Sequence, residues 1–159
     1  MADQETRILI VDDDQEFADS LAEHMSELGH SVKVAYDGQQ GLDQFRTGDF
    51  HLVLTDLQMP GMDGIALLHE IKGLDHRCVV VLITGFGTVE SAVKAIKEGA
   101  YDFITKPLKF DQVDVVVHRA LEKRHLVKQL DFFRGLTLAV IISVPLWLVL
   151  GIILASKIF

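Results

Sequence analysis

Four hydrophobic runs of this chain end in polar residues that could together carry out phosphoryl chemistry. These residues are the pair Asp12 and Asp13, and then Asp56, Thr84 and Lys106. Three clustered carboxylates repel one another unless a cation neutralises them, and oxygen ligands with open positions favour Mg²⁺. Such a cation would offset the charge of an incoming phosphoryl group and leave one carboxylate oxygen to attack phosphorus.

Lys106 and Thr84 suit the same chemistry, because an ammonium attracts phosphoryl oxygens and a hydroxyl can donate to one. Gly85, next to Thr84, keeps the entrance to the site open. Each residue also has an ordinary structural explanation; for example, Asp13 or Asp14 could cap the helix that follows. The joint pattern favours a site, because four strand ends agree.

The elements that must bring these residues together are strands that alternate with helices. Short apolar or β-branched runs predict strands at residues 8–11, 32–36, 51–55, 78–84 and 101–104. Nearly continuous apolar runs are typical of parallel strands that are covered on both faces. We therefore expect an α/β fold with a doubly wound, five-stranded parallel sheet, whose sites form beyond the carboxyl ends of the strands.

Apolar residues at helical spacing predict five helices, four between the strands and one after the last strand. The positions that mark them are Phe17, Leu21, Met25 and Leu28; Gly41, Leu42 and Phe45; Ile65, Leu68 and Ile71; Val89, Val93 and Ile96; and Val113, Val117 and Leu121. Gly29, Gly73 and Gly99 are expected to end the first, third and fourth helices, since glycine is common just after a helix.

Four segments of the chain match a known family. They are ILIVDDD (8–14), LVLTDLQMPGMDG (52–64), VLITG (81–85) and YDFITKP (101–107). Over about residues 5–125 the chain resembles the receiver domain of two-component response regulators, which has a flavodoxin-like fold. The resemblance implies a member of a phosphorelay signal transduction system that receives its phosphoryl group from a sensor histidine kinase or a phosphotransfer protein.

The resemblance also implies roles for individual residues. Asp56 would accept the phosphoryl group. Mg²⁺ would be held by Asp13, Asp56 and the backbone carbonyl of Gln58, with Asp12 acting through a metal-bound water. Thr84 and Phe103 match the family's switch pair, and Lys106 would hold the phosphoryl group. The Lys106–Pro107 bond is expected to be cis. Self-catalysed phosphotransfer and slow autodephosphorylation are expected, without a dedicated enzymatic domain.

Composition excludes several other functions. The first 134 residues hold 23 acidic and 14 basic residues, a net charge of −9. With no basic stripe, they are not expected to bind nucleic acid. The seven histidines lack metal-binding spacing, and neither a phosphate-binding nucleotide loop nor a serine nucleophile elbow occurs. Cys78 is the one cysteine, so no internal disulfide forms, which is typical of a reducing cytoplasm.

The last part of the chain has a different composition. Residues 136–155 form an uncharged stretch of 20 residues, and a helix of about 20 residues spans a bilayer core. We expect a helical stalk at residues 126–134 and a transmembrane helix at residues 135–156. Basic residues precede the stretch and only Lys157 follows it. The positive-inside rule therefore predicts a single-pass protein of the cytoplasmic membrane with its receiver domain in the cytoplasm.

Small residues recur at four-residue spacing in this stretch, which would allow close helix contact. A homodimer through this helix, and through the face of the fourth and fifth helices, is one hypothesis; ordinary small residues in an apolar segment are the alternative. We expect no output domain after the receiver, and hence a membrane-tethered, single-domain response regulator that signals through a phosphorylation-dependent surface. The alternatives are a phosphotransfer relay or phosphate sink, and a constitutive membrane adaptor with an idle site.

Overall fold

The computed structural model describes residues 6–85 and 87–122. The chain divides into two units, Met1–Arg124 and His125–Phe159, and the second unit lies outside the described residues. The first unit alternates strands and helices. Its elements are β1 (Arg7–Val11), α1 (Gln15–Glu27), β2 (Ser31–Ala35), α2 (Gly38–Thr47), β3 (Leu52–Asp56), α3 (Gly64–Leu74), β4 (Val79–Thr84), α4 (Val89–Lys97), β5 (Asp102–Thr105) and a final helical stretch at 110–122.

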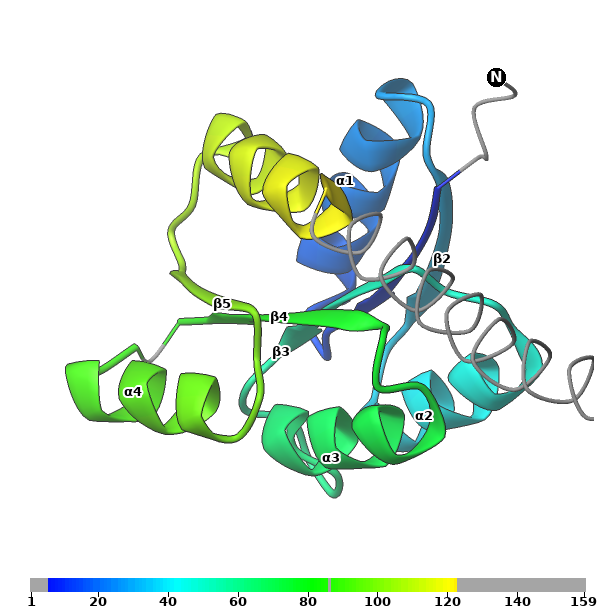
Figure 1. Cartoon of the computed structure of the whole chain (residues 1–159). Helices are drawn as coiled ribbons and strands as arrows, with labels where there is room; N and C mark the ends of the chain where they lie inside the picture. Colours follow the sequence, from blue (N-terminus) through cyan, green and yellow to red (C-terminus); the bar gives the residue numbers. More distant parts are fainter. Residues whose placement is uncertain (1–5, 86, 123–159) are drawn as a thin grey trace, which may run out of the picture. The chain divides into compact units, whose positions relative to one another are not determined.

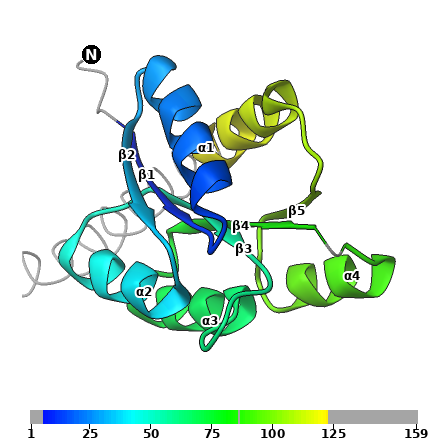
Figure 2. The same ribbon diagram turned by 180° about the vertical axis from the view of Figure 1, so that it is seen from behind.

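The strands form one parallel sheet in the order β2-β1-β3-β4-β5. Helices α2, α3 and α4 cover one face, while α1 and the helix of residues 110–122 cover the other (Figures 1 and 2). The strand order reverses beside β1, and crevices at such a reversal are where ligands bind in open α/β sheets. This confirms the predicted fold class.

The sheet is buried on both faces because successive strand residues point to opposite sides. In β3, for example, Val53 packs with α2 and α3, whereas Leu54 packs with α1. All of β3 and β4 is buried, which accounts for their nearly continuous apolar sequences.

Aspartates begin three of the helices. Asp14 caps α1, with its side chain accepting from Phe17 N at 3.1 Å, and Asp37 and Asp63 cap α2 and α3 in the same way. These caps satisfy backbone N–H groups that have no partner inside the helix. The capping role considered for Asp13 or Asp14 therefore belongs to Asp14.

Two of the three predicted glycine stops are confirmed. Gly29 and Gly99 follow α1 and α4 with φ of 87° and 103°, where glycine avoids the steric cost of a Cβ. The prediction that Gly73 ends the third helix is wrong. It lies inside α3, which continues to Leu74 and is capped by Asp75, whose N–H donates to Ile71 O at 2.8 Å.

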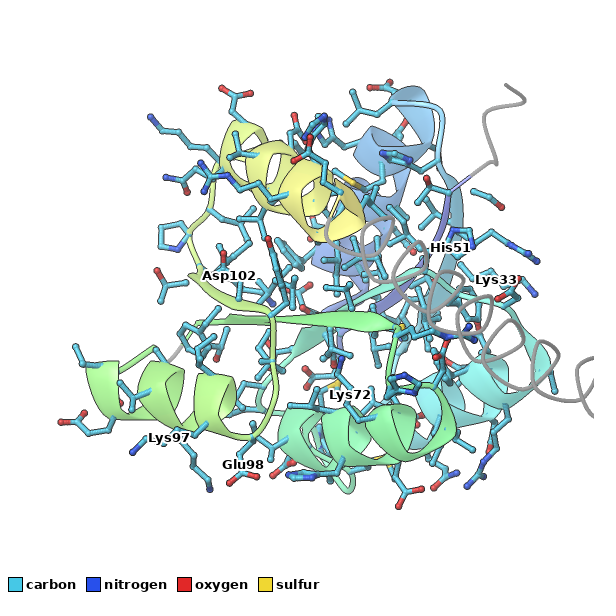
Figure 3. The ribbon with its side chains drawn as sticks, viewed as in Figure 1. Lys33, His51, Lys72, Lys97, Glu98 and Asp102 are labelled. Carbon is cyan, nitrogen blue, oxygen red and sulfur yellow. The ribbon has the colours of Figure 1, made fainter. Side chains whose placement is uncertain are left out.

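The apolar residues that predict α4 do not face the core. Ala95 is the buried residue of this helix, while Val89, Val93 and Ile96 are 78%, 48% and 48% exposed. At the C-terminal end of α4, Lys97 and Glu98 extend outward (Figure 3). The helical period was correct, but it describes an apolar stripe on the surface.

Across residues 6–85 and 87–122, the structure has no helix that is both long enough and apolar enough to cross a membrane. The predicted stalk (126–134) and transmembrane helix (135–156) lie outside these residues. Their boundaries stay predictions.

Candidate functional site

The carboxyl ends of four parallel strands bring the predicted site residues to one edge of the sheet. Asp12 directly follows β1, Asp56 is the last residue of β3, Thr84 is the last residue of β4, and Lys106 follows β5. Asp12, Asp56 and Thr84 are only 2%, 5% and 0% exposed. Buried carboxylates are costly unless they are paired, so their partners define the site.

Lys106 is the partner that the two buried carboxylates share. Its Nζ lies 2.6 Å from Asp12 Oδ2 and 3.3 Å from Asp56 Oδ1. The backbone holds the other oxygen of each carboxylate, since Asp14 N donates to Asp12 Oδ1 at 3.0 Å and Gln58 N donates to Asp56 Oδ2 at 2.6 Å. Each carboxylate is therefore fixed through both of its oxygens.

The electrostatics of the site disfavour two charged carboxylates. Burial raises the pKa of Asp12 and of Asp56, and their hydrogen bonds and the charge of Lys106 only partly oppose that effect. The nearby charge of Asp13 adds to the rise for Asp56. For Lys106, burial lowers the pKa, but the hydrogen bond and charge of Asp12 and the charge of Asp56 outweigh it and raise the pKa overall.

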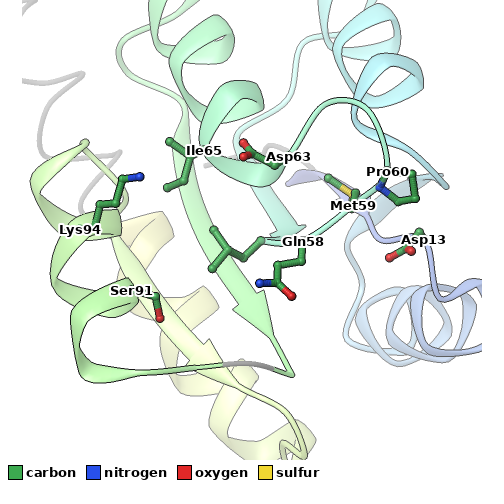
Figure 4. Close-up of a pocket in the computed structure, with 9 residues that line it drawn as sticks. Asp13, Gln58, Met59, Pro60, Asp63, Ile65, Ser91 and Lys94 are labelled. Carbon is green, nitrogen blue, oxygen red and sulfur yellow. The ribbon is translucent and has the colours of Figure 1, made fainter.

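Asp13 and Gln58 open onto a cleft beside the buried pair. The cleft encloses about 580 Å³. Figure 4 shows the residues that line it, from the β1–α1 loop, the β3–α3 loop, the first turn of α3 and α4; they are Asp13, Leu57, Gln58, Met59, Pro60, Asp63, Ile65, Ser91 and Lys94. Asp13 is exposed here, unlike Asp12, so the two neighbours have different surroundings.

The donor set fits a hard divalent cation. Oxygen ligands on two buried, mutually repelling carboxylates, with a third carboxylate at the open side, are what Mg²⁺ prefers. Among the residues that the structure describes, no group of three or more His, Cys, Asp or Glu side chains is arranged to enclose a metal. The predicted set differs from such a group, since it combines two direct carboxylates with a backbone carbonyl and a water.

The remaining predicted residues lie around this centre. Thr84 is fully buried, and its backbone oxygen accepts from Lys106 N at 2.8 Å. Phe103 is half-buried and packs against the core on the α3 and α4 face. Gly85 is exposed, and a Cβ there would meet nothing within 4 Å. The Lys106–Pro107 bond is cis, as predicted.

The sequence pattern did not identify three residues that hold the site in place. The Phe17 ring lies beneath the Lys106 ammonium, with 4.0 Å between Nζ and the ring centroid. Thr55 is fully buried and donates from Oγ1 to Asp56 O at 3.1 Å. Gly64 lies so close to the Asp56 carbonyl that a Cβ would overlap it. The sequence predicted Phe17 only as an apolar position of the first helix. An aromatic residue four positions after the Asp pair is the signal that could have suggested its role.

Comparison with known proteins identifies the family of this fold and site. The family model described as "Response regulator receiver domain" matches residues 8–118. Among curated proteins, the transcriptional regulatory protein ZraR of Escherichia coli O157:H7 is 42% identical over 120 residues, covering 76% of this chain and 27% of ZraR. The chain thus spans about a quarter of the length of the curated relatives that it matches.

Solved structures agree with the sequence match. NtrX from Brucella abortus, in complex with ADP, has a TM-score of 0.76 and 40% identity, covering 80% of this chain and 29% of NtrX. A response regulator receiver domain protein from Clostridium thermocellum has a TM-score of 0.73 and 27% identity, covering 77% of this chain and 98% of its own.

Receiver domains of two-component response regulators are not dedicated enzymes. They accept a phosphoryl group on an aspartate, from a histidine kinase or a phosphotransfer protein, and generally bind Mg²⁺ at that position. The strand order, the acidic cluster at the strand ends and the match over residues 8–118 lead to one conclusion. The chain belongs to the response regulator receiver domain family.

Proposed function

We propose that Asp56 accepts a phosphoryl group from the phosphohistidine of a sensor kinase or phosphotransfer protein. The observation that carries this proposal is the shared ion pair of Lys106 with Asp12 and Asp56. In it, one cation lies within 3.3 Å of an oxygen of each of two carboxylates, and the three groups come from three different strand ends. Asp56 is the member of that arrangement that we assign as the acceptor.

The chemistry requires little beyond positioning and charge. An Asp56 oxygen attacks phosphorus as the phosphorus–nitrogen bond of phosphohistidine breaks, and the imidazole leaves. Lys106 attracts one phosphoryl oxygen and the Thr84 hydroxyl donates to another. Mg²⁺, when bound, would offset the charge of the acidic cluster; Asp13, Asp56 and the Gln58 carbonyl would hold it, with Asp12 acting through a water.

We further propose that phosphorylation is read out on the surface formed by α4, β5 and the helix of residues 110–122. Thr84 is the last residue of β4, and Phe103 is the second residue of β5. These two strands support this surface. A switch that biases two arrangements of packed side chains can change such a surface. The exposed Val89, Val93 and Ile96 of α4 supply apolar area on it for a protein partner.

Membrane tethering is part of the same proposal. The uncharged stretch of residues 136–155 and the excess of basic residues before it support a single transmembrane helix with the receiver in the cytoplasm. The relatives are named transcriptional regulators and extend well beyond the matched region. The expectation that this protein does not bind nucleic acid rests on the acidic composition of residues 1–134, and the names of these relatives count against it.

Fractionation tests the tether. We expect the full chain to stay in the membrane pellet after washing with high salt and alkaline carbonate. A variant that lacks residues 135–156 should appear in the supernatant. If the full chain is released by these washes, the tether is wrong, while the proposal for Asp56 stands.

Phosphotransfer tests the acceptor. Radiolabelled phosphohistidine kinases would be mixed with the wild type, with Asp56→Ala, and with Asp49→Ala as a control for loss of an exposed carboxylate elsewhere. Label should appear in the wild type and the Asp49→Ala variant and be absent from Asp56→Ala. Label on the Asp56→Ala variant would contradict the assignment.

The lifetime of the phosphorylated form separates the switch from a phosphate relay or sink. A form that persists long enough to bind a partner supports a switch. Rapid return of label to a phosphohistidine supports a relay. A constitutive adaptor predicts that Asp56→Ala leaves the cellular phenotype intact.

A further inference from the structure

The Lys106 ammonium has an aromatic neighbour in addition to its two carboxylates. Its Nζ stands 4.0 Å from the centroid of the Phe17 ring. Phe17 is half-buried in the first turn of α1, and the Lys106 side chain is 20% exposed. An ammonium over an aromatic face is attracted by the ring quadrupole, and more strongly where water is partly excluded.

The helix start that carries this ring is linked to the same carboxylate that binds Lys106. Asp12 Oδ1 accepts from Asp14 N, and Asp14 Oδ1 accepts from Phe17 N at 3.1 Å. Asp12 Oδ2 binds Lys106 directly, and Lys106 lies over the Phe17 ring. The contacts form a closed circuit that starts and ends at Asp12, so the start of α1 and the Lys106 side chain are placed together.

We infer that Phe17 is a positioning residue for the phosphoryl transfer, acting through Lys106. This inference rests on the proposed function of Asp56 as acceptor. Lysine is a point charge on a flexible four-carbon stem, and fixing it costs conformational entropy. With one side against the ring, its N–H donors remain directed to Asp12, Asp56 and the incoming phosphoryl oxygens.

The geometry can be tested without any phosphoryl donor. In the full-length chain in detergent micelles, the ring current of Phe17 should shift the NMR signals of the Lys106 ε-methylene upfield. The shift should vanish in Phe17→Leu and persist in Phe17→Tyr. Unchanged Lys106 signals in Phe17→Leu would overturn the inference at its structural basis.

The role in phosphoryl transfer is tested with phosphoramidate as donor in the presence of Mg²⁺. We expect Phe17→Leu to be phosphorylated about fivefold more slowly, which corresponds to about 1 kcal/mol, and Phe17→Tyr to keep the wild-type rate. Replacing Phe17 with pentafluorophenylalanine keeps the ring's shape but reverses its quadrupole, so the rate should fall as it does for Leu.

Phe110→Leu is the matched control. Phe110 is also half-buried, and its ring stacks on the His24 ring at 4.6 Å between centroids, whereas the ring under the Lys106 ammonium is that of Phe17. Its substitution should leave the rate unchanged. A wild-type rate for the fluorinated protein, or equal slowing in Phe110→Leu, would show that Phe17 only supplies packing. A wild type that is not phosphorylated at all would instead overturn the proposed function.

Discussion

Asp12 and Asp56 are buried, close together and bonded to one lysine. The pKa of each is raised chiefly by burial, so the folded chain holds their charges against a free-energy cost at neutral pH. Such a cost is common where activity requires a strained or charged site. The residue types and their strand-end positions were predictable from the sequence. The sharing of Lys106 was not, because it depends on how two side chains 94 residues apart meet in space.

Asp56→Asn should stabilise the metal-free protein near neutral pH by about 1 kcal/mol. The amide oxygen can still accept from Gln58 N, while the buried charge is removed. A folded-state pKa above the ordinary value means that stability is fully present below that value and falls as pH rises through the folded pKa.

The gain from Asp56→Asn should therefore shrink as the pH is lowered toward about 4. Urea unfolding of both proteins at several pH values measures it. A variant that is less stable than the wild type at neutral pH would show that the ion pair with Lys106 outweighs burial.

Mg²⁺ should stabilise the wild type against thermal unfolding, because a ligand that binds only the folded state adds RT ln(1 + [L]/Kd). Asp13→Asn should lose most of the increase in melting temperature. Asp43→Asn removes an exposed carboxylate on α2 and should keep it. Equal Mg²⁺ effects in the two variants would argue against Asp13 as a ligand.

At the level of elements, the junction of β3 and α3 carries the acceptor. The boundaries of the strands were predicted within one residue, since apolar runs stop where the chain leaves the core. The end of α3 was not predicted correctly. A glycine ends a helix only where its backbone reaches a positive φ, and Gly73 stays helical. The closeness of Gly64 to the Asp56 carbonyl also depends on the tertiary path of the β3–α3 loop, which local sequence does not reveal.

The two glycines of α3 should respond oppositely to alanine. In Gly64→Ala the new Cβ overlaps backbone of Asp56 and approaches Leu57 Cα at 3.0 Å, and such overpacking costs about 1–3 kcal/mol. In Gly73→Ala nothing lies within 4 Å, so helix propensity should add about 1 kcal/mol. Guanidinium unfolding of both variants gives the comparison; two changes of the same sign would refute this account.

For the molecule as a whole, α1 is joined to the helix of residues 110–122 by a polar contact at the surface of the apolar core. His24 Nε2 lies 2.8 Å from Asp114 Oδ1, and its ring stacks on Phe110. These residues are about 90 apart in the chain, so helical periodicity predicted each helix but not their link. His30 lies near the same carboxylate, after the end of α1.

His30 should contribute to acid sensitivity of the fold. Burial lowers its pKa from 6.5, and the charge of Asp114 opposes this only in part. As pH falls below 6.5, the unfolded chain takes up a proton that the folded chain does not, so stability decreases toward the lowered pKa. His30→Gln should lose less stability than the wild type across this range, and the exposed His76→Gln serves as control. Identical pH profiles for wild type and His30→Gln would rule this out.

Cys78 immediately precedes β4, is fully buried, and is the one cysteine in the sequence. A thiol reagent can therefore modify this protein only when the structure around the amino end of β4 opens. The rate of alkylation in native buffer therefore measures how often this opening occurs, because each molecule has a single thiol that can react. Ligands that stabilise the carboxyl ends of the strands should slow the alkylation of Cys78. The alkylation rate would then report on occupancy of the site, although Cys78 lies at the opposite end of the strands.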